Sequence, residues 1–297
     1  MRDLVELLVF HDERILRGRW LYHGFILTEV KECPVLIKDL IDKKSEANCP
    51  IGKRIHYVEL TSGSIGSSST RTAVKWAKLF KDVCYENMRF YLLGINLPNI
   101  NYDAFGSKSD GRDRNFRVYN KFFEIGLFSA CRWFFDSATV DVEIENIFSE
   151  EYILEKHNPF TSYAPFKINK RESNIKVKTK YITQISSTPL KERKYRDYVH
   201  VLNLADVLIG SFSEVFDYSS TQDGCIEVAE KIYGICNRLS KNPFNARSRY
   251  YKKYAISFFP KDRLKLSKIL QSKTSQLNNQ FYNERQLCLR QPRLFKC

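Results

Sequence analysis

The stretch HVLNLADVLIG (residues 200–210) decides the fold, because its pattern predicts a helix that is buried on every side. Apolar residues occupy nearly every position around it, whereas a surface helix carries them on one face only. Asp206 stands in the middle, and the positions three and four residues away carry no Lys or Arg that could pair with it. An isolated buried carboxylate is too costly to stay ionised. Asp206 therefore needs a distant basic partner, a proton or a bound cation.

Outward from this helix, the chain alternates between strand patterns and helix patterns. Runs rich in apolar and β-branched residues predict strands at 6–12, 20–30, 54–60, 89–96, 139–144 and 176–185. Helical spacing of apolar residues predicts helices at 34–43, 71–87, 115–135, 195–216 and 225–239. A turn at Arg17 and Gly18 would join the first two strands into a hairpin. This order predicts an α/β fold with a mixed β-sheet flanked by helices.

The charge of the chain is concentrated at its C-terminal end. Residues 1–150 carry 21 basic and 21 acidic side chains, whereas residues 238–297 carry 15 basic side chains against two acidic ones. Such asymmetry is typical of a surface that binds a polyanion. It divides the chain into a predicted core, 1–240, and a basic, aromatic-rich C-terminal extension, 241–297.

The extension interleaves basic and aromatic residues in a pattern that suits nucleic acid. Lysine and arginine can bind phosphates, while tyrosine rings can stack on unpaired bases. We therefore predict DNA or RNA as the partner. The predicted nucleic-acid-binding residues are Arg247, Arg249, Tyr250, Lys252, Lys253 and Tyr254.

Three further acids stand at the ends of predicted strands, in an isolation similar to that of Asp206 in its helix. Asp12 follows the first apolar strand, Glu59 ends the strand at 54–60, and Glu145 ends the strand at 139–144. Carboxylates gathered by folding form an oxygen-only site, which suits hard cations such as Mg²⁺ or Mn²⁺. Two such ions about 4 Å apart stabilise the attacking and leaving oxygens of phosphoryl transfer. Asp12, Glu59, Glu145 and Asp206 are thus the predicted metal ligands and catalytic residues.

These motifs resemble the ribonuclease-H-like family known as domain of unknown function 3800. The matching segments are FHDE (10–13), HYVEL (56–60), VEIE (142–145) and LNLADVLIG (202–210), and the resemblance spans roughly residues 5–240. It implies a ribonuclease-H-like sheet with acids gathered at one end, and metal-dependent hydrolysis of phosphodiester bonds in DNA or RNA.

The chain departs from the family pattern at three positions. Arg14 follows the first motif where the family has Ser-Gly, Asn203 replaces a common Gln, and Glu145 replaces Asp. These departures leave a second hypothesis open, a catalytically degenerate protein that binds nucleic acid or another partner on the same scaffold. A carboxylate-pair hydrolase acting on sugars is disfavoured, because its substrate would not require so basic an extension.

Other kinds of site find less support in the sequence. The eight cysteines include no C-x-x-C pair, and the histidines lack metal-ligand spacing, although His11 or His56 could assist proton transfer. The longest apolar run near the N-terminus, residues 7–10, is too short for a signal peptide or a membrane span. We therefore expect reduced thiols, no membrane association and a cytoplasmic location.

Overall fold

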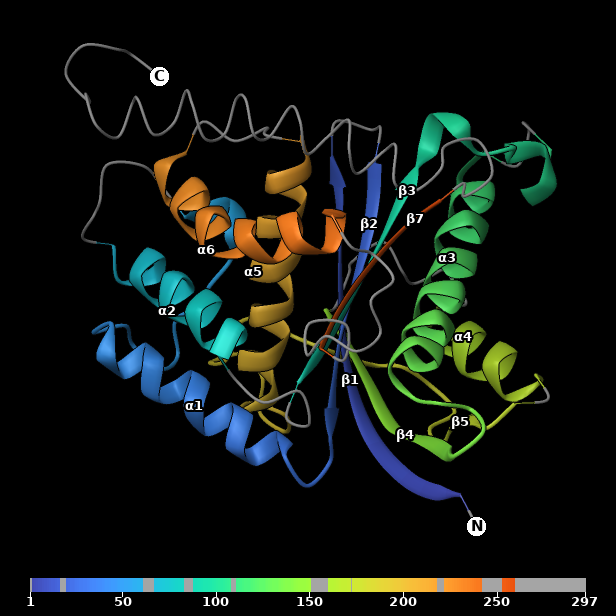
Figure 1. Cartoon of the computed structure of the whole chain (residues 1–297), viewed down its shortest axis with the longest axis horizontal. Helices are drawn as coiled ribbons and strands as arrows, with labels where there is room; N and C mark the ends of the chain where they lie inside the picture. The colour runs from blue at the N-terminus through green and yellow to red at the C-terminus, as the bar shows by residue number, and fades with distance from the viewer. Residues whose placement is uncertain are drawn as a thin grey trace.

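The protein has an α/β fold in which helices cover both faces of a mixed, seven-stranded sheet (Figure 1). The computed structural model describes residues 2–16, 20–60, 67–82, 88–107, 111–150, 160–171, 173–217, 222–241 and 253–259. The predicted fold class, a mixed sheet flanked by helices, is confirmed.

The sheet is built around an antiparallel meander followed by parallel strands. Its main path is β5-β4-β1-β2-β3-β7, and β6 also pairs with β4. The antiparallel part contains β1 (Asp3–Leu16), β2 (Trp20–Glu29) and β3 (Arg89–Asn96). The parallel partners are β4 (Val140–Glu150) beside β1, β5 (Ile175–Val177) and β6 (Thr183–Ile185) beside β4, and β7 (Tyr254–Phe259) beside β3.

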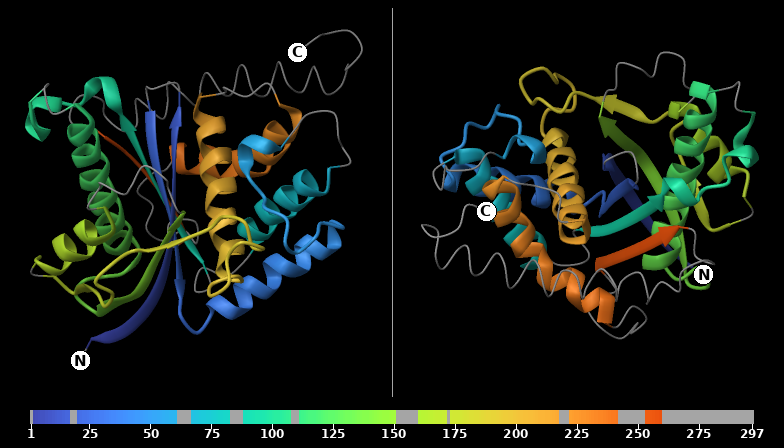
Figure 2. Two further views of the ribbon diagram at one scale, coloured as in Figure 1. Left: turned by 180° about the vertical axis from the view of Figure 1, so that it is seen from behind. Right: turned by 90° about the horizontal axis from the view of Figure 1, so that it is seen from above.

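The helices form two layers, one on each face of the sheet (Figures 1 and 2). One layer contains α1 (Cys33–Glu46), α2 (Ser68–Asp82), α5 (Tyr198–Asp217) and α6 (Asp223–Lys241). The other contains α3 (Gly111–Phe134) and α4 (Phe160–Asn169). Where the structure describes the connections, they contain the short 3-10 helices η1 (Tyr57–Glu59), η2 (Leu97–Asn99) and η3 (Tyr102–Phe105).

Helix α5 lies against β1 and β2 and is the central element of its layer. It is the one described helix long and apolar enough to cross a membrane, but 94% of its most apolar stretch is buried inside the protein. It is therefore a core helix, as in a soluble protein, and the burial predicted for residues 200–210 is confirmed. Five described cysteines (Cys33, Cys49, Cys131, Cys225 and Cys236) are likewise buried, and they are free thiols.

A β-bulge interrupts β4 at Glu145. Leu7 of β1 pairs with Ile144, and the next residue, Leu8, pairs with Asn146, so Glu145 has no partner on β1. Side chains alternate along a strand, and one extra residue exchanges the faces for everything that follows. Phe148 therefore packs on Phe10 in the layer of α5, with ring centroids 5.2 Å apart.

Three expectations about the elements are wrong. Residues 54–60 form no strand, because the chain there runs extended only to His56 and then makes the 3-10 helix η1. The predicted strand at 176–185 is two three-residue strands, β5 and β6. Strand β7 lies beyond residue 240 and pairs with β3, so the core does not end at that predicted boundary.

Candidate functional site

Two of the predicted acids, Asp12 of β1 and Asp206 of α5, lie near each other where α5 packs on the sheet. The Asp12 side chain shares its face of β1 with Leu8 and Phe10, which pack in the layer of α5. Asp12 is only 7% exposed. Burial raises the pKa of Asp12 well above its usual value, and the nearby charges of Asp206, Glu13 and Glu150 raise it further. The helix and the strand thus bring together acids that are 194 positions apart in the sequence.

Glu150 is the third acid of this site, and the sequence analysis missed it. His11 of β1 pairs with Ser149, so the next residues along the two strands are Asp12 and Glu150. The bulge at Glu145 turns Glu150 to the face that carries Asp12. The Glu150 Oε1 atom accepts hydrogen bonds from Ser187 and, at 3.1 Å, from Arg54.

Asp206 is held in place by the segment that precedes η1. Its Oδ2 atom accepts a hydrogen bond from the backbone N–H of Tyr57 at 2.6 Å and lies 2.8 Å from His56 Nδ1. Burial disfavours the charged form of His56, but the hydrogen bond and charge of Asp206 outweigh it, so the pKa of His56 is raised. His56 can therefore carry a proton beside the three acids.

Gly210 allows η1 to approach α5 this closely. A Cβ atom at Gly210 would lie 2.1 Å from Tyr57 Cγ. Tyr57 is fully buried, and its hydroxyl donates to the carbonyl of Cys225 at 2.8 Å. Gly210 on one side and the carbonyl of Cys225 on the other fix the Tyr57 ring. The backbone N–H of Tyr57 therefore stays directed at Asp206, which lies one turn before Gly210 in α5.

A buried lysine holds the loop that leads into the site. Lys44 Nζ donates to the carbonyls of Ile51, at 2.7 Å, and Lys53. Burial lowers the pKa of Lys44 to about 8. These bonds fix the loop just before Arg54 and His56, two of the side chains that contact the acids.

Each of the three carboxylates keeps one oxygen without a hydrogen bond from any described residue. Asp12 Oδ1 accepts from the backbone N–H of Glu13 at 2.8 Å, Asp206 uses Oδ2, and Glu150 uses Oε1. The second oxygens, Asp12 Oδ2, Asp206 Oδ1 and Glu150 Oε2, remain for a ligand. A carboxylate with one oxygen oriented by a hydrogen bond and the other available is suited to coordinate a hard cation through a single oxygen.

The opposite face of β1 carries a second buried polar group. His11 Nε2 lies 3.0 Å from His23 Nδ1, and His11 Nδ1 lies 3.2 Å from Ser149 Oγ. Burial lowers the pKa of both histidines, that of His23 to about 3, so both are neutral. Glu13 is directed to the same side, where burial raises its pKa to about 7 against the opposing hydrogen bond from Tyr119.

The structure places Glu59 beside the site but does not join it to the other acids. Glu59 is exposed at the end of η1, and its charge helps to raise the pKa of His56. Its prediction rested on a strand at 54–60. Because η1 replaces that strand, the side chain acts on His56 from a distance.

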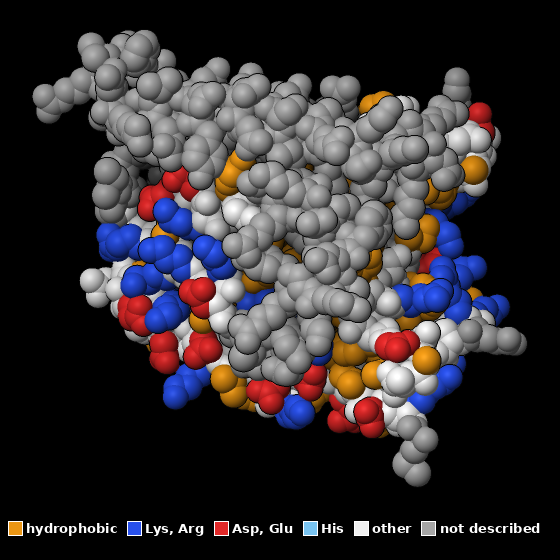
Figure 3. Space-filling model, in the orientation of Figure 1, with side chains coloured by type: hydrophobic (Ala, Val, Ile, Leu, Met, Phe, Trp, Pro, Cys, Tyr) orange, Lys and Arg blue, Asp and Glu red, His pale blue; other side chains and the backbone are white. Residues whose placement is uncertain are grey.

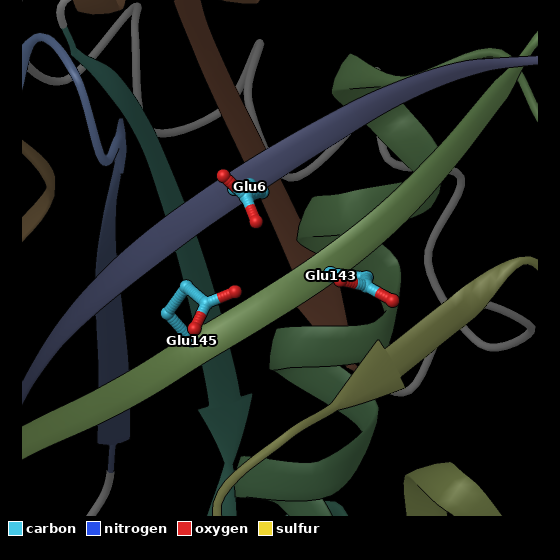
Figure 4. A group of neighbouring side chains, drawn as sticks. All are labelled: Glu6, Glu143 and Glu145. Carbon is cyan, nitrogen blue, oxygen red and sulfur yellow. The ribbon is translucent and has the colours of Figure 1, made fainter.

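The structure corrects the prediction that Glu145 belongs to this site, because Glu145 lies away from Asp12 and Asp206. It stands beside Glu6 and Glu143, with oxygens of the three side chains within 4.8 Å of one another (Figure 4). Among the described residues this is the one acidic triplet so closely spaced, but Lys178 already forms ion pairs with all three of its carboxylates. Lys178 Nζ lies 2.9 Å from Glu143, 3.4 Å from Glu6 and in contact with Glu145. Along β1, Glu6 and Asp12 are separated by about 20 Å.

The predicted nucleic-acid-binding residues fall into two groups. Arg247, Arg249, Tyr250 and Lys252 lie outside the described residues. The prediction is wrong for Lys253 and Tyr254, which are 5% and 3% exposed. Tyr254 begins β7, and its hydroxyl donates to the carbonyl of Phe80 at 2.9 Å, so its ring cannot stack on a base.

No protein-family model, curated protein or solved structure matches the chain.

Proposed function

We propose that the protein is a divalent-metal-dependent nuclease with a ribonuclease-H-like core, whose metal ligands are Asp12, Glu150 and Asp206. One observation carries the proposal: the buried Asp12 carboxyl shares a face of the sheet with Glu150 of the adjacent strand, and this face is covered by α5, which carries Asp206. The pKa of Asp12, raised by burial and by the charges of Asp206 and Glu150, agrees with this arrangement. A cluster of carboxyl groups that concentrates negative charge in this way is stabilised by a cation. The three oxygens without hydrogen bonds from described residues supply the donor set that Mg²⁺ or Mn²⁺ prefers.

The spacing of the acids favours more than one ion, or ions bound partly through water. The side-chain oxygens of Asp12, Glu150 and Asp206 do not all lie within 4.8 Å of one another, as those of the Glu6, Glu143 and Glu145 triplet do. Two ions about 4 Å apart need ligands on both sides, and Mg²⁺ keeps several waters. When bound there, the metal would supply Lewis-acid polarisation of a phosphodiester.

Basic side chains around the acids fit a phosphodiester substrate. The Arg14 guanidinium lies over the Tyr57 ring, 5.0 Å from its centroid, and makes no ion pair with a described carboxylate. An arginine so close in sequence to Asp12 would compete with a metal if it paired with that carboxylate, but Arg14 is directed to the Tyr57 ring instead. We assign Arg14 to binding a phosphate oxygen, and His56 to holding a proton near the leaving oxygen.

The order of the elements supports the ribonuclease-H-like part of the proposal. Strand β1 carries Asp12 and forms a hairpin with β2, a later parallel strand ends in Glu150, and then α5 carries Leu-Ala-Asp. This is the order that the resemblance in the sequence implies, with Glu150 in place of Glu145. The nucleic acid partner and the cytoplasmic location remain predictions.

A second candidate function is binding without catalysis. Arg54 contacts Glu150 at 3.1 Å and His56 contacts Asp206 at 2.8 Å, so two of the three acids already have a basic partner. A protein in which these partners replace the metal would bind nucleic acid in a salt-sensitive manner. It would cleave nothing, whichever divalent cation is added.

The test compares two glutamates of the same strand. Purified protein is incubated with single-stranded and duplex DNA and RNA in Mg²⁺ or Mn²⁺. We expect cleavage that Asp12→Asn, Asp206→Asn and Glu150→Gln abolish and that the matched control Glu145→Gln retains. Retained cleavage in Glu150→Gln would refute the assignment of ligands, and binding without cleavage in any cation would favour the second function.

A further inference from the structure

We propose that a groove between α4 and the segment joining β5 to β6 binds unpaired nucleic acid, its lysines contacting phosphates and its aromatic rings stacking on bases. The groove has a volume of about 510 Å³. Its charged and aromatic lining residues are Tyr163, Phe166, Lys167, Lys170, Lys180 and Tyr181. This deepens the proposed function, on which the choice of ligand rests, by naming a substrate class and the surface that holds it.

The charge of the groove has one sign. No described acidic residue lines it, and Lys167, Lys170 and Lys180 are exposed and form no ion pair with a described carboxylate. The nearby Glu124 is 2% exposed and already paired with Lys121 and Arg171. Three unneutralised lysines in one groove complement the phosphates of a nucleic acid backbone.

The aromatic rings are available for stacking. Phe166 is 54% exposed and Tyr181 is 55% exposed, both unusually open for large apolar side chains. Each is now covered by a lysine: Lys170 Nζ lies 4.5 Å from the Phe166 ring centroid, and Lys180 Nζ lies 5.9 Å from that of Tyr181. Stacking on a base is worth more than an exposed cation–π contact. A base can therefore take the ring face while the lysine moves to a phosphate.

The groove continues along the helices of this layer. Tyr163 also lines a second hollow of about 600 Å³, where Arg117 and Lys121 of α3 add positive charge. In the space-filling view, Lys and Arg side chains gather over α3 and α4 on one side of the molecule, and over α1 and α2 on the other (Figure 3). A path of basic and aromatic side chains longer than one nucleotide is thus present beside α4.

The sheet edge connects this groove to the candidate active site, which lies on the opposite face. The chain leaves the groove at Tyr181, forms the edge strand β6 and reaches Ser187, whose hydroxyl donates to Glu150. Six residues span at most about 20 Å. A flexible single strand held in the groove can pass over this edge to the acids, whereas a stiff duplex is a poorer fit to such a turn.

Binding is measured without catalysis, by fluorescence anisotropy of a labelled oligothymidylate on the full chain in EDTA over a range of KCl concentrations. We expect the triple variant Lys167→Gln, Lys170→Gln, Lys180→Gln to bind at least tenfold more weakly at low salt. The slope of log affinity against log salt should fall by about 2, because each phosphate contact to a single strand contributes roughly 0.7. The control Lys38→Gln, Lys78→Gln, Lys81→Gln removes the same charge from exposed positions on α1 and α2 and should change little.

A second pair of variants separates stacking from charge. The double variant Phe166→Ala, Tyr181→Ala should lose roughly tenfold in affinity with an unchanged salt slope. The double variant Phe166→Tyr, Tyr181→Phe keeps both rings and should bind normally. Unchanged urea midpoints of all variants would show that these exposed positions do not affect folding.

Three results would overturn the proposal. These are equal weakening by the α1 and α2 control, normal binding by both groove variants, and binding of a poly-glutamate peptide as tight as that of the oligonucleotide. Because EDTA removes divalent ions, the outcome is independent of cleavage. Groove-dependent binding without any cleavage contradicts the proposed function alone, whereas cleavage with groove-independent binding contradicts this inference alone.

Discussion

Replacing Glu13 by glutamine tests the effect of a buried carboxyl group on stability. The burial of this group makes the protein less stable as the pH rises. Burial raises the pKa of Glu13 to about 7 from an ordinary value of 4.5. Because the folded protein holds this proton more tightly than the unfolded chain, the contribution of Glu13 to stability is fully present below pH 4.5. It is lost as the pH rises through about 7. The sign is opposite to that of a carboxylate in a stabilising salt bridge.

The size of the effect follows from the size of the shift. Each pKa unit corresponds to about 1.4 kcal/mol, so the full shift would correspond to about 3 kcal/mol. The Glu13 side chain is 25% exposed, and solvent screening reduces the effect to about 2 kcal/mol. Glutamine keeps the shape of the side chain but cannot ionise, so Glu13→Gln removes this loss.

Urea unfolding at pH 5 and pH 8.5 measures the effect. We expect Glu13→Gln to be close to the parent protein at pH 5 and more stable by about 2 kcal/mol at pH 8.5. The control Asp82→Asn changes an exposed carboxylate at the end of α2 and should not change the dependence on pH. A difference between Glu13→Gln and the parent that is the same at both pH values would refute the reasoning.

Three more predictions test the site and the elements that hold it. Asp12→Asn should make the protein more stable at pH 8 without metal, because it removes a carboxyl whose pKa is raised by burial and like charges and which therefore destabilises the folded protein as the pH rises. It should also lose the Mn²⁺-induced rise in melting temperature, which a free ion at 100 times its Kd would otherwise support with about 2.7 kcal/mol. Gly210→Ala should destabilise by about 1–3 kcal/mol in urea, because its Cβ would lie 2.1 Å from Tyr57. Lys44→Met should cost about 1–3 kcal/mol and speed amide hydrogen exchange at 51–53, where two carbonyls lose their donor.

The sequence predicts the buried elements of the fold well. The residues of α5 are apolar on all sides, and a helix of that kind has to lie inside the protein, where it is. The same pattern isolates Asp206, and the hairpin of β1 and β2 brings Asp12 to the face of α5. These predictions succeed because burial leaves a strong periodic signal in a short stretch of chain.

The predictions that fail depend on contacts between distant segments. The apolar residues of 54–60 suit a strand, but Tyr57 is held on Gly210 and Cys225 of other elements, and η1 results. Likewise, Tyr254 reads as part of a basic surface because lysines and arginines precede it. Pairing of β7 with β3 draws its ring into the core beside Phe80, 4.7 Å away between centroids. Neither partner is visible from the local sequence.

The choice between Glu145 and Glu150 shows how one local feature decides the chemistry of a site. The alternation in residues 140–145 predicts the first half of β4 correctly, since Val142 and Ile144 do share a face. If that alternation continued, Glu150 would lie with Val142 on the side of α3. The bulge reverses it, and the side chain of Asn146 fixes the reversal by accepting from the backbone N–H of Ile147, at 2.8 Å, and from Thr183 on β6. An acid five residues beyond the apparent end of the strand thereby joins Asp12, because a bulge re-aims every later side chain of its strand.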